Sequence, residues 1–256
     1  MKTIILAGGL GTRLSEETEV RPKPMVEVGG RPILWHIMKI YSHYGLNEFI
    51  LALGYKADYI KKYFLEYARH SGNITVNINN GESQIIQREQ DEWTIHLEET
   101  GVDTMTGGRI KSLAQWVEGE TFMVTYGDGV ADININDLIK YHKKMGKLAT
   151  ITAVRPPARF GGLFMEDGIV QKFTEKPQAG EGWINGGFIV FEPQVLEMIQ
   201  GPKSSLEAEL LEELAAMGQL AAFSHDGFWQ CMDTLRDLKY LESLWSAGTA
   251  PWKVWR

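Results

Sequence analysis

Residues 2–24 read KTIILAGGLGTRLSEETEVRPKP, and the first half of this stretch decides the fold. The apolar run Thr3–Ala7 has the composition of a buried strand, and it ends in the glycine-rich turn Gly8–Thr12. Glycine lets the backbone of such a turn approach a phosphate closely and turn its amide groups toward an anion. Arg13 follows the turn directly, and Lys23 lies between two prolines that hold the chain extended. The stretch therefore predicts a strand that opens into a loop suited to a triphosphate.

Two better-known glycine-rich loops do not fit this stretch. The dinucleotide fingerprint, counted from Gly9 and Gly11, requires a third glycine where this chain has Leu14. The P-loop requires Gly-Lys followed by Ser or Thr, whereas this turn ends in Gly11-Thr12-Arg13. A nicotinamide-dependent enzyme is therefore a weaker alternative, and a test for NAD binding would separate it.

Composition bounds the class of protein. The chain has 256 residues, of which 44% are hydrophobic and 23% charged, and this is enough for one large core, so we expect a single domain over residues 1–256. A net charge of −7 disfavours nucleic acid and anionic membranes as partners. The positive charge that binds a polyanionic ligand must then come from a local cluster, and Arg13, Arg21 and Lys23 form such a cluster. The single cysteine, Cys231, and the lack of a charged-then-apolar leader favour a cytoplasmic location.

Helical and strand patterns alternate after the loop. Pro32 precedes an amphipathic helix over Ile33–Tyr41 that Gly45 stops, Glu48–Leu53 is a second buried strand, and Ala57–Ala68 is another helix. This alternation predicts an α/β fold with a doubly wound, mostly parallel, Rossmann-like mixed sheet flanked by helices. The ligand crevice of such a sheet lies at the carboxyl ends of its strands.

Two regions depart from the alternation. Residues 74–98 change between apolar and polar without a helical period, around the turn Asn79–Gly81, and predict a small β-rich excursion. Near the end of the chain, Trp252 and Trp255 suggest a tail that docks onto the chain's own body or onto another subunit. An open strand edge and exposed tryptophans both favour a homo-oligomer.

A carboxylate follows the next predicted strand. The apolar run Thr121–Tyr126 ends just before Asp128, which places this aspartate at the mouth of the crevice, where Mg²⁺ would sit with a nucleotide phosphate. Asp132 is interpreted as a turn cap because the calcium-loop pattern is incomplete. His36 and Cys231 have no partner motif. His36 is interpreted as a packing or surface residue and Cys231 as a packed thiol.

The second half of the chain continues with a predicted hairpin over residues 156–177, which turns at Asp167-Gly168 and ends in Glu175-Lys176-Pro177. A helix over Leu206–Met217, a strand over Leu220–Ser224 and a final helix over Thr234–Trp245 complete the prediction.

Together, the pattern G-G-x-G-T-R-L followed by P-K-P resembles the signature of the sugar-phosphate nucleotidyltransferases, and the resemblance covers nearly the whole chain. It implies a GT-A-like sheet and transfer of a nucleotidyl group to a sugar 1-phosphate with release of pyrophosphate. The segments Thr106–Lys111, Thr125–Val130, Asn185–Phe188 and Trp229–Thr234 look closest to members that make CDP-glucose from CTP and glucose 1-phosphate, a precursor of deoxysugars in bacterial surface polysaccharide. UTP or dTTP with another hexose 1-phosphate, or a non-catalytic regulatory subunit, are the alternatives.

The resemblance also implies site residues. Catalysis is assigned to Arg13, Lys23 and Asp128, with Lys23 between the reacting phosphates and no covalent intermediate. Magnesium is assigned to Asp128 and Asp233. The nucleotide is assigned to Leu6, Ala7, Gly8, Gly9, Gly11, Thr12, Arg13, Lys23, Thr104, Arg109 and Asp128. The sugar and its phosphate are assigned to the half of the chain over about 150–256, through Gly162, Glu175, Lys176, Asn185 and Gly186, together with Tyr126.

Two of these assignments have structural alternatives. Asp233 precedes a predicted helix, so a helix cap would explain it equally well. The Arg109 guanidinium, if aimed at N3 and O2 of cytosine, would discriminate against uracil, whose N3 donates a hydrogen bond where cytosine N3 accepts one. The alternative is that Arg109 caps its surroundings or reaches a phosphate.

Overall fold

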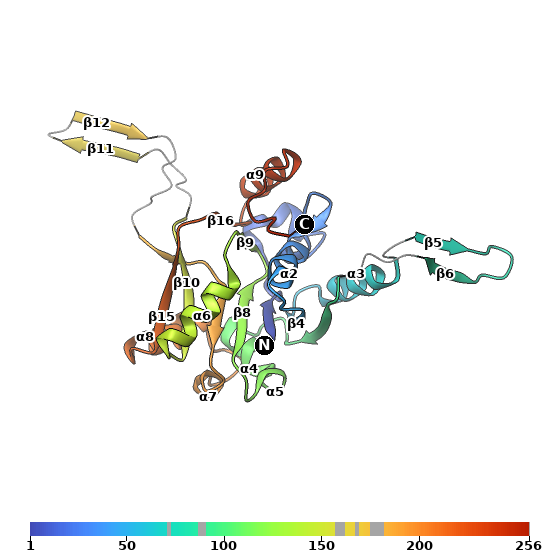
Figure 1. Cartoon of the computed structure of the whole chain (residues 1–256), viewed down its shortest axis with the longest axis horizontal. Helices are drawn as coiled ribbons and strands as arrows, with labels where there is room; N and C mark the ends of the chain where they lie inside the picture. The colour runs from blue at the N-terminus through green and yellow to red at the C-terminus, as the bar shows by residue number, and fades with distance from the viewer. Residues whose placement is uncertain (71–72, 87–90, 157–161, 167–168, 175–181, 256) are drawn as a thin grey trace.

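The computed structural model describes residues 1–70, 73–86, 91–156, 162–166, 169–174 and 182–255. Over these residues an eight-stranded mixed sheet forms the centre of the molecule (Figure 1). Its strands are β1 (Thr3–Leu6), β4 (Glu48–Leu53), β7 (Thr94–Glu99), β8 (Phe122–Tyr126), β10 (Ala149–Val154), β13 (Ile184–Asn185), β14 (Ile189–Phe191) and β15 (Leu220–His225). The predicted doubly wound α/β fold is confirmed.

Strand β1 lies in the middle of the parallel part of this sheet. It pairs in parallel with β4 on one side and β8 on the other, so that Ile5 stands opposite Leu51 and Thr125. Strand β7 continues the parallel part beyond β4, whereas β14 pairs antiparallel to both β8 and β10, and β15 runs parallel to β10 at the far edge. The carboxyl ends of β1, β4, β7 and β8 therefore meet at one edge of the sheet.

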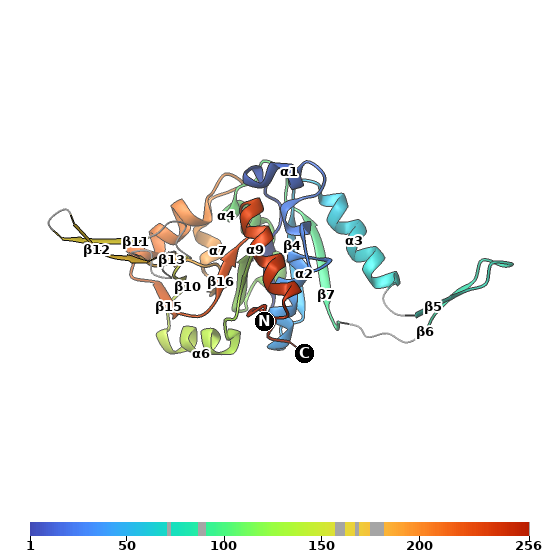
Figure 2. The same cartoon turned by 90° about the horizontal axis from the view of Figure 1, so that it is seen from above.

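Helices cover both faces of the sheet (Figure 2). Along each strand, successive side chains point to opposite faces, so Ile5 joins one core and Ile4 the other. The first core packs against α2 (Ile33–His43), α3 (Ala57–His70), α6 (Ile135–Met145) and α9 (Leu235–Ser246). The second packs against α4 (Thr106–Ser112), α5 (Ala114–Val117), α7 (Val195–Met198), the π-helical turn η3 (Leu206–Leu211) and α8 (Glu212–Ala216). Two buried faces explain why the strands read as continuous apolar runs.

Short elements complete the described chain. The 3₁₀ turn η1 (Thr12–Leu14) and the helix α1 (Ser15–Thr18) follow the glycine loop, and a second 3₁₀ turn, η2, spans Lys23–Met25. Strands β2 (Glu27–Val28) and β3 (Arg31–Pro32) pair with each other, as do β9 (Gly129–Ala131) and β16 (Trp229–Cys231).

Two hairpins project from the body in Figure 1, β5–β6 (Asn73–Val76 and Ser83–Ile86) and β11–β12 (Gly162–Glu166 and Ile169–Thr174). The second is the hairpin predicted over residues 156–177. The excursion predicted over 74–98 is divided, because Thr94–Glu99 pairs with β4 as the edge strand of the central sheet. An edge strand is only half covered, so its alternating side chains resemble those of a free hairpin, and alternation alone does not reveal the partner.

The C-terminal tail docks onto the chain's own body. Trp252 is fully buried, packs against Phe228 and Trp245, and donates a hydrogen bond from Nε1 to Nδ1 of His36 at 3.3 Å. Trp255 packs edge-on against Trp35 of α2. Exposed tryptophans therefore no longer argue for an oligomer. Of the two interpretations of His36, that of a packing residue agrees with its full burial.

Acid is expected to destabilise the protein through His36. Burial lowers its pKa to about 4, below the 6.5 of an unfolded chain, and Nδ1 is the acceptor for Trp252. Protonation would replace this acceptor with a donor facing another donor. The stabilisation is complete above about pH 6.5 and is lost as pH falls toward 4, which lowers the free energy of unfolding by about 3 kcal/mol. Chemical denaturation across this range should show a shallower pH slope for His36→Gln than for the control His43→Gln, a substitution at the exposed end of the same helix. Equal slopes in His36→Gln and the unsubstituted protein would contradict the assignment.

Candidate functional site

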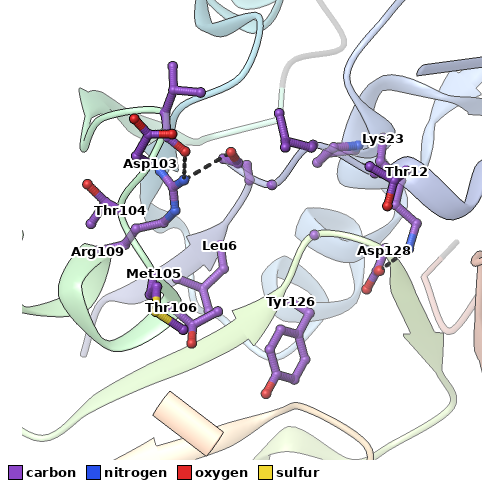
Figure 3. A pocket seen from close by; sticks show the side chains of 18 of the residues that line it. Leu6, Thr12, Lys23, Asp103, Thr104, Met105, Thr106, Arg109, Tyr126 and Asp128 are labelled. Atoms are coloured by element: carbon purple, nitrogen blue, oxygen red, sulfur yellow. Dashed lines mark hydrogen bonds and ion pairs between the residues drawn. The ribbon is translucent and has the colours of Figure 1, made fainter. Parts of the chain in front are cut away.

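A cavity of about 580 Å³ opens at the carboxyl ends of β1 and β8 (Figure 3). It is large enough for a nucleotide. The residues that line it come from the glycine loop, the turn η2, the segment before α4, the end of β8 and the start of η3. They are Leu6, Ala7, Gly8, Gly9, Leu10, Gly11, Thr12, Lys23, Pro24, Val102, Asp103, Thr104, Met105, Thr106, Arg109, Tyr126, Gly127, Asp128 and Glu207.

Two glycines of the loop, Gly11 and Gly8, are favoured for different structural reasons. Gly11 adopts a φ of +65°, which favours glycine over other residues. A side chain on Gly8 would collide with the Arg109 guanidinium, since a Cβ there would lie 2.2 Å from one of its nitrogens. Gly9 has open space around it. The sequence suggested phosphate approach as the reason for all of them, whereas at Gly8 the Arg109 guanidinium fills the space that a side chain would take.

Lys23 lies at one wall of the cavity, between two carboxylates. Its Nζ donates to Oδ2 of Asp128 and to Oδ1 of Asp233, both at 2.5 Å. Burial alone would lower the pKa of Lys23, but the two carboxylates raise it above its ordinary value, so the side chain carries a full charge at neutral pH. Pro24 and Met25 are buried and hold the backbone of η2 in place. Figure 3 shows Lys23 directed at Asp128.

Asp233 reaches this site through strand pairing. Strand β16 lies antiparallel to β9, and the Met232 amide donates to the carbonyl of Asp128 at 2.8 Å. This pairing brings together two aspartates far apart in the sequence. The helix-cap alternative for Asp233 is wrong, because Thr234 caps α9 and forms a capping box with Asp237. The neighbouring Cys231 is a half-buried thiol whose pKa is raised to about 12, mainly by burial, in keeping with the packed thiol expected from the sequence.

Arg109 is buried and bonds to the protein itself. One terminal nitrogen donates to the carbonyl of Gly101 at 2.8 Å, to Thr100 Oγ1 at 2.6 Å and to the carbonyl of Leu53 at 3.1 Å. The other donates to the carbonyls of Gly8 at 3.0 Å and Val102 at 3.2 Å. These contacts differ from the expectation of a guanidinium aimed at N3 and O2 of a base. They tie the glycine loop to the segment that follows β7, which would fix the distance between two walls of the cavity.

CTP and UTP are the candidate nucleotides that the family resemblance implies. Arg109→Ala is expected to lower kcat/KM for both together, by about tenfold to a hundredfold, because both would need the same two walls. Steady-state kinetics with each nucleotide checks this. Arg109→Lys serves as a comparison, since a lysine reaches fewer acceptors. A selective loss of CTP use, with UTP unchanged, would show that Arg109 reads the base.

A second network was not foreseen from the sequence. Glu207 Oε1 accepts from the Tyr126 hydroxyl at 2.7 Å, and Oε2 accepts from the hydroxyls of Thr106 at 2.7 Å and Ser205 at 3.1 Å. Asn185 Nδ2 donates to the Tyr126 hydroxyl at 3.3 Å. Burial and the nearby Glu207 carboxylate raise the pKa of Tyr126, so its hydroxyl stays protonated. Glu207 lies within a predicted helix without any local motif, and only the fold brings it to the cavity.

The remaining predicted residues lie outside the cavity lining or outside the described part of the structure. Asn185 and Gly186 are outside the cavity lining, and the Gly186 carbonyl accepts from Trp229 Nε1 at 2.8 Å. Gly162 begins β11 in a projecting hairpin. Glu175, Lys176 and the side chain of Arg13 lie outside the described part of the structure.

The donors at Lys23 fit a divalent cation in part. Two carboxylate oxygens that contact one ammonium group stand close enough for one cation, and hard oxygen ligands suit Mg²⁺. Within the ranges that the structure describes, no cluster of three or more Asp, Glu, His or Cys residues could hold a metal. A metal here would need further oxygens, which nucleotide phosphates supply.

Comparisons with known proteins agree over the whole chain. Residues 2–248 match the family described as Nucleotidyl transferase. The chain is 52% identical over 256 residues, the full length of both, to the glucose-1-phosphate cytidylyltransferase of Salmonella typhi. It is 46% identical, again over the full length of both, to the probable glucose-1-phosphate cytidylyltransferase of Bacillus subtilis.

Solved structures share the fold. HddC from Yersinia pseudotuberculosis superposes with a TM-score of 0.67 at 27% identity and covers 95% of this chain and 99% of its own. A putative glucose-1-phosphate thymidylyltransferase from Bacillus anthracis superposes with a TM-score of 0.66 at 21% identity, with 95% of this chain and 94% of its own covered, and supports the fold alone.

Proposed function

The chain belongs to the nucleotidyl transferase family, and from this membership we infer that it makes CDP-glucose and pyrophosphate from CTP and glucose 1-phosphate. This is the reaction of a glucose-1-phosphate cytidylyltransferase, and the full-length identity of 52% supports it. The structural observation that carries it is Lys23 between Asp128 and Asp233 at the wall of a nucleotide-sized cavity. Loss of Arg13, Lys23 or Asp128 would have favoured a non-catalytic subunit, and all three are present in the sequence.

In the reaction, a phosphate oxygen of glucose 1-phosphate attacks the α-phosphorus of CTP in line, and pyrophosphate leaves. Negative charge accumulates on the phosphates as the bond forms, and the Lys23 ammonium group offers a positive charge within reach of them. The amides of the glycine loop, together with Arg13, are proposed to hold the leaving pyrophosphate. The protein's contribution is then to position the two substrates and to neutralise their charge, without a covalent intermediate.

Magnesium is proposed as the cofactor, with Asp128 and Asp233 as its protein ligands. When bound, such an ion polarises the phosphate oxygens and neutralises their charge. The family resemblance and the paired carboxylates support this choice.

We assign the glucose moiety to the side of the cavity next to Tyr126 and Asn185, whose side chains are hydrogen bonded to each other. Glu175 and Lys176 are proposed to contact the sugar and its phosphate, in keeping with the sugar-binding half over about 150–256. Synthesis of deoxysugars for O-antigen in lipopolysaccharide is the proposed use of the product. A cytoplasmic location is proposed, because the reaction needs CTP. Among the described residues, no helix has the length and apolarity to cross a bilayer.

The decisive experiment measures pyrophosphate release by the purified protein with Mg²⁺, across four nucleoside triphosphates and several sugar 1-phosphates. The expected result is highest kcat/KM for CTP with glucose 1-phosphate, and CDP-glucose as the product by mass spectrometry. A preference for UTP or dTTP, or for another sugar, would replace the assignment with another member of the family.

We also propose a homo-oligomer, now on the basis of the β5–β6 hairpin alone. This hairpin projects from the body and exposes Ile74, Val76 and Ile78 to solvent. Apolar side chains on a projecting two-stranded ribbon are more stable when another surface covers them. Sedimentation at micromolar concentration should show a species larger than 28.9 kDa, and Ile74→Asp with Ile78→Asp should reduce it. A monomer in the unsubstituted protein would contradict the proposal.

A further inference from the structure

Lys23 contacts two groups of the site at once. Its ammonium group bonds to Asp128 and Asp233, while its Cβ lies next to the glycine loop, since a Cβ built on Gly11 would stand 3.0 Å from it. The backbone of η2 is held by buried neighbours, but the four-carbon side chain can rotate. The phosphate loop and the carboxylate pair are therefore both within reach of one flexible cation.

The same carboxylate oxygens serve the ammonium group and would serve a divalent cation. An ammonium group and a divalent cation that share these oxygens would repel each other at short range, in a site with limited exposure to water. Without the ammonium, two adjacent carboxylates would repel each other and would bind a divalent cation more strongly. The occupants of this position therefore compete.

We propose that, in the nucleotide-free protein, the Lys23 ammonium occupies the position of the divalent cation between Asp128 and Asp233. A triphosphate in the cavity attracts Lys23 to its own oxygens and leaves the carboxylates to the metal. Nucleotide and metal then bind cooperatively, and free metal binds poorly by itself. This proposal rests on the proposed function, because it takes the triphosphate as the ligand of the cavity.

The test measures Mn²⁺ binding to the full chain without nucleotide, by the electron paramagnetic resonance signal of free Mn²⁺, with Mg²⁺ as competitor. Lys23→Met and Lys23→Gln are compared with the unsubstituted protein, and thermal melting confirms that each variant is folded. Lys39→Met is the matched control, since Lys39 is also a half-buried lysine that pairs with a carboxylate, that of Asp91 at 2.7 Å, and lies outside the cavity lining. The double variant Lys23→Met/Asp128→Asn reports on the location of the metal.

The expected result is Mn²⁺ binding at least about tenfold tighter in both Lys23 variants, within the range of ordinary coupling between two sites. Lys39→Met should bind Mn²⁺ like the unsubstituted protein, and the double variant should lose the gain. Unchanged or weaker binding in the folded Lys23 variants, or a gain that persists in the double variant, would overturn the proposal. Tight Mn²⁺ binding by the unsubstituted protein without nucleotide would overturn it as well.

Pyrophosphate release by the unsubstituted protein separates this proposal from the proposed function. If CDP-glucose forms while the Lys23 variants bind Mn²⁺ no better, only the competition is wrong. If no pyrophosphate is released from any nucleotide, the proposed function is wrong, whatever the metal titration shows.

Discussion

Replacing Lys23 by alanine is expected to lower kcat by about a hundredfold to a thousandfold, in the range seen when one group that stabilises transition-state charge is removed. Lys23 is the cation that the structure places at the cavity wall with both aspartates. Steady-state release of pyrophosphate measures the effect, and circular dichroism checks the fold.

The chain should remain folded after this substitution. Asp128 is partly open to water at the mouth of the cavity and can be solvated when its partner is removed. Lys39→Ala is the control for the loss of an ion-paired lysine, and it should leave kcat unchanged. A folded Lys23→Ala protein with near-normal turnover would remove Lys23 from the reaction.

The second large effect is expected at the carboxylate pair. Asp128→Asn and Asp233→Asn should each lower kcat at saturating substrate by about a hundredfold or more and raise the Mg²⁺ concentration needed for half-maximal activity. The double variant should be little worse than the more damaged single variant, because two ligands of one ion act as a unit.

The readout is a Mg²⁺ titration of activity in all four proteins. Asp237→Asn offers a comparison, because Asp237 belongs to the capping box of α9 and should change stability more than Mg²⁺ dependence. Losses that multiply in the double variant would mean that Asp128 and Asp233 do not share a metal.

Local signals were sufficient for most of the fold. The run Thr3–Ala7, the helix after Pro32 and the strand Glu48–Leu53 were predictable because apolar periodicity depends only on neighbours along the chain. The same holds for the glycine loop and for Asp128, since a polar residue after a buried parallel strand must lie at the ligand edge of the sheet. The edge strand β7 was placed in the β-rich excursion over 74–98, because an alternating pattern does not show which strand it pairs with, and β7 in fact pairs with β4.

The sequence by itself determined a doubly wound α/β fold and a strand that opens into a glycine-rich loop, and it predicted residues for the reaction. Only the tertiary structure decided the contacts of Asp233 and Arg109, and it added Glu207, which the sequence did not predict. Strand pairing between β9 and β16 brings Asp233 to Lys23, the packing of α4 places Arg109 where it donates to the Gly8 carbonyl, and the turn η3 carries Glu207 to Tyr126. Each of these contacts joins residues far apart in the sequence, and no local pattern encodes such a distance, because it follows from the packing of whole elements against one another.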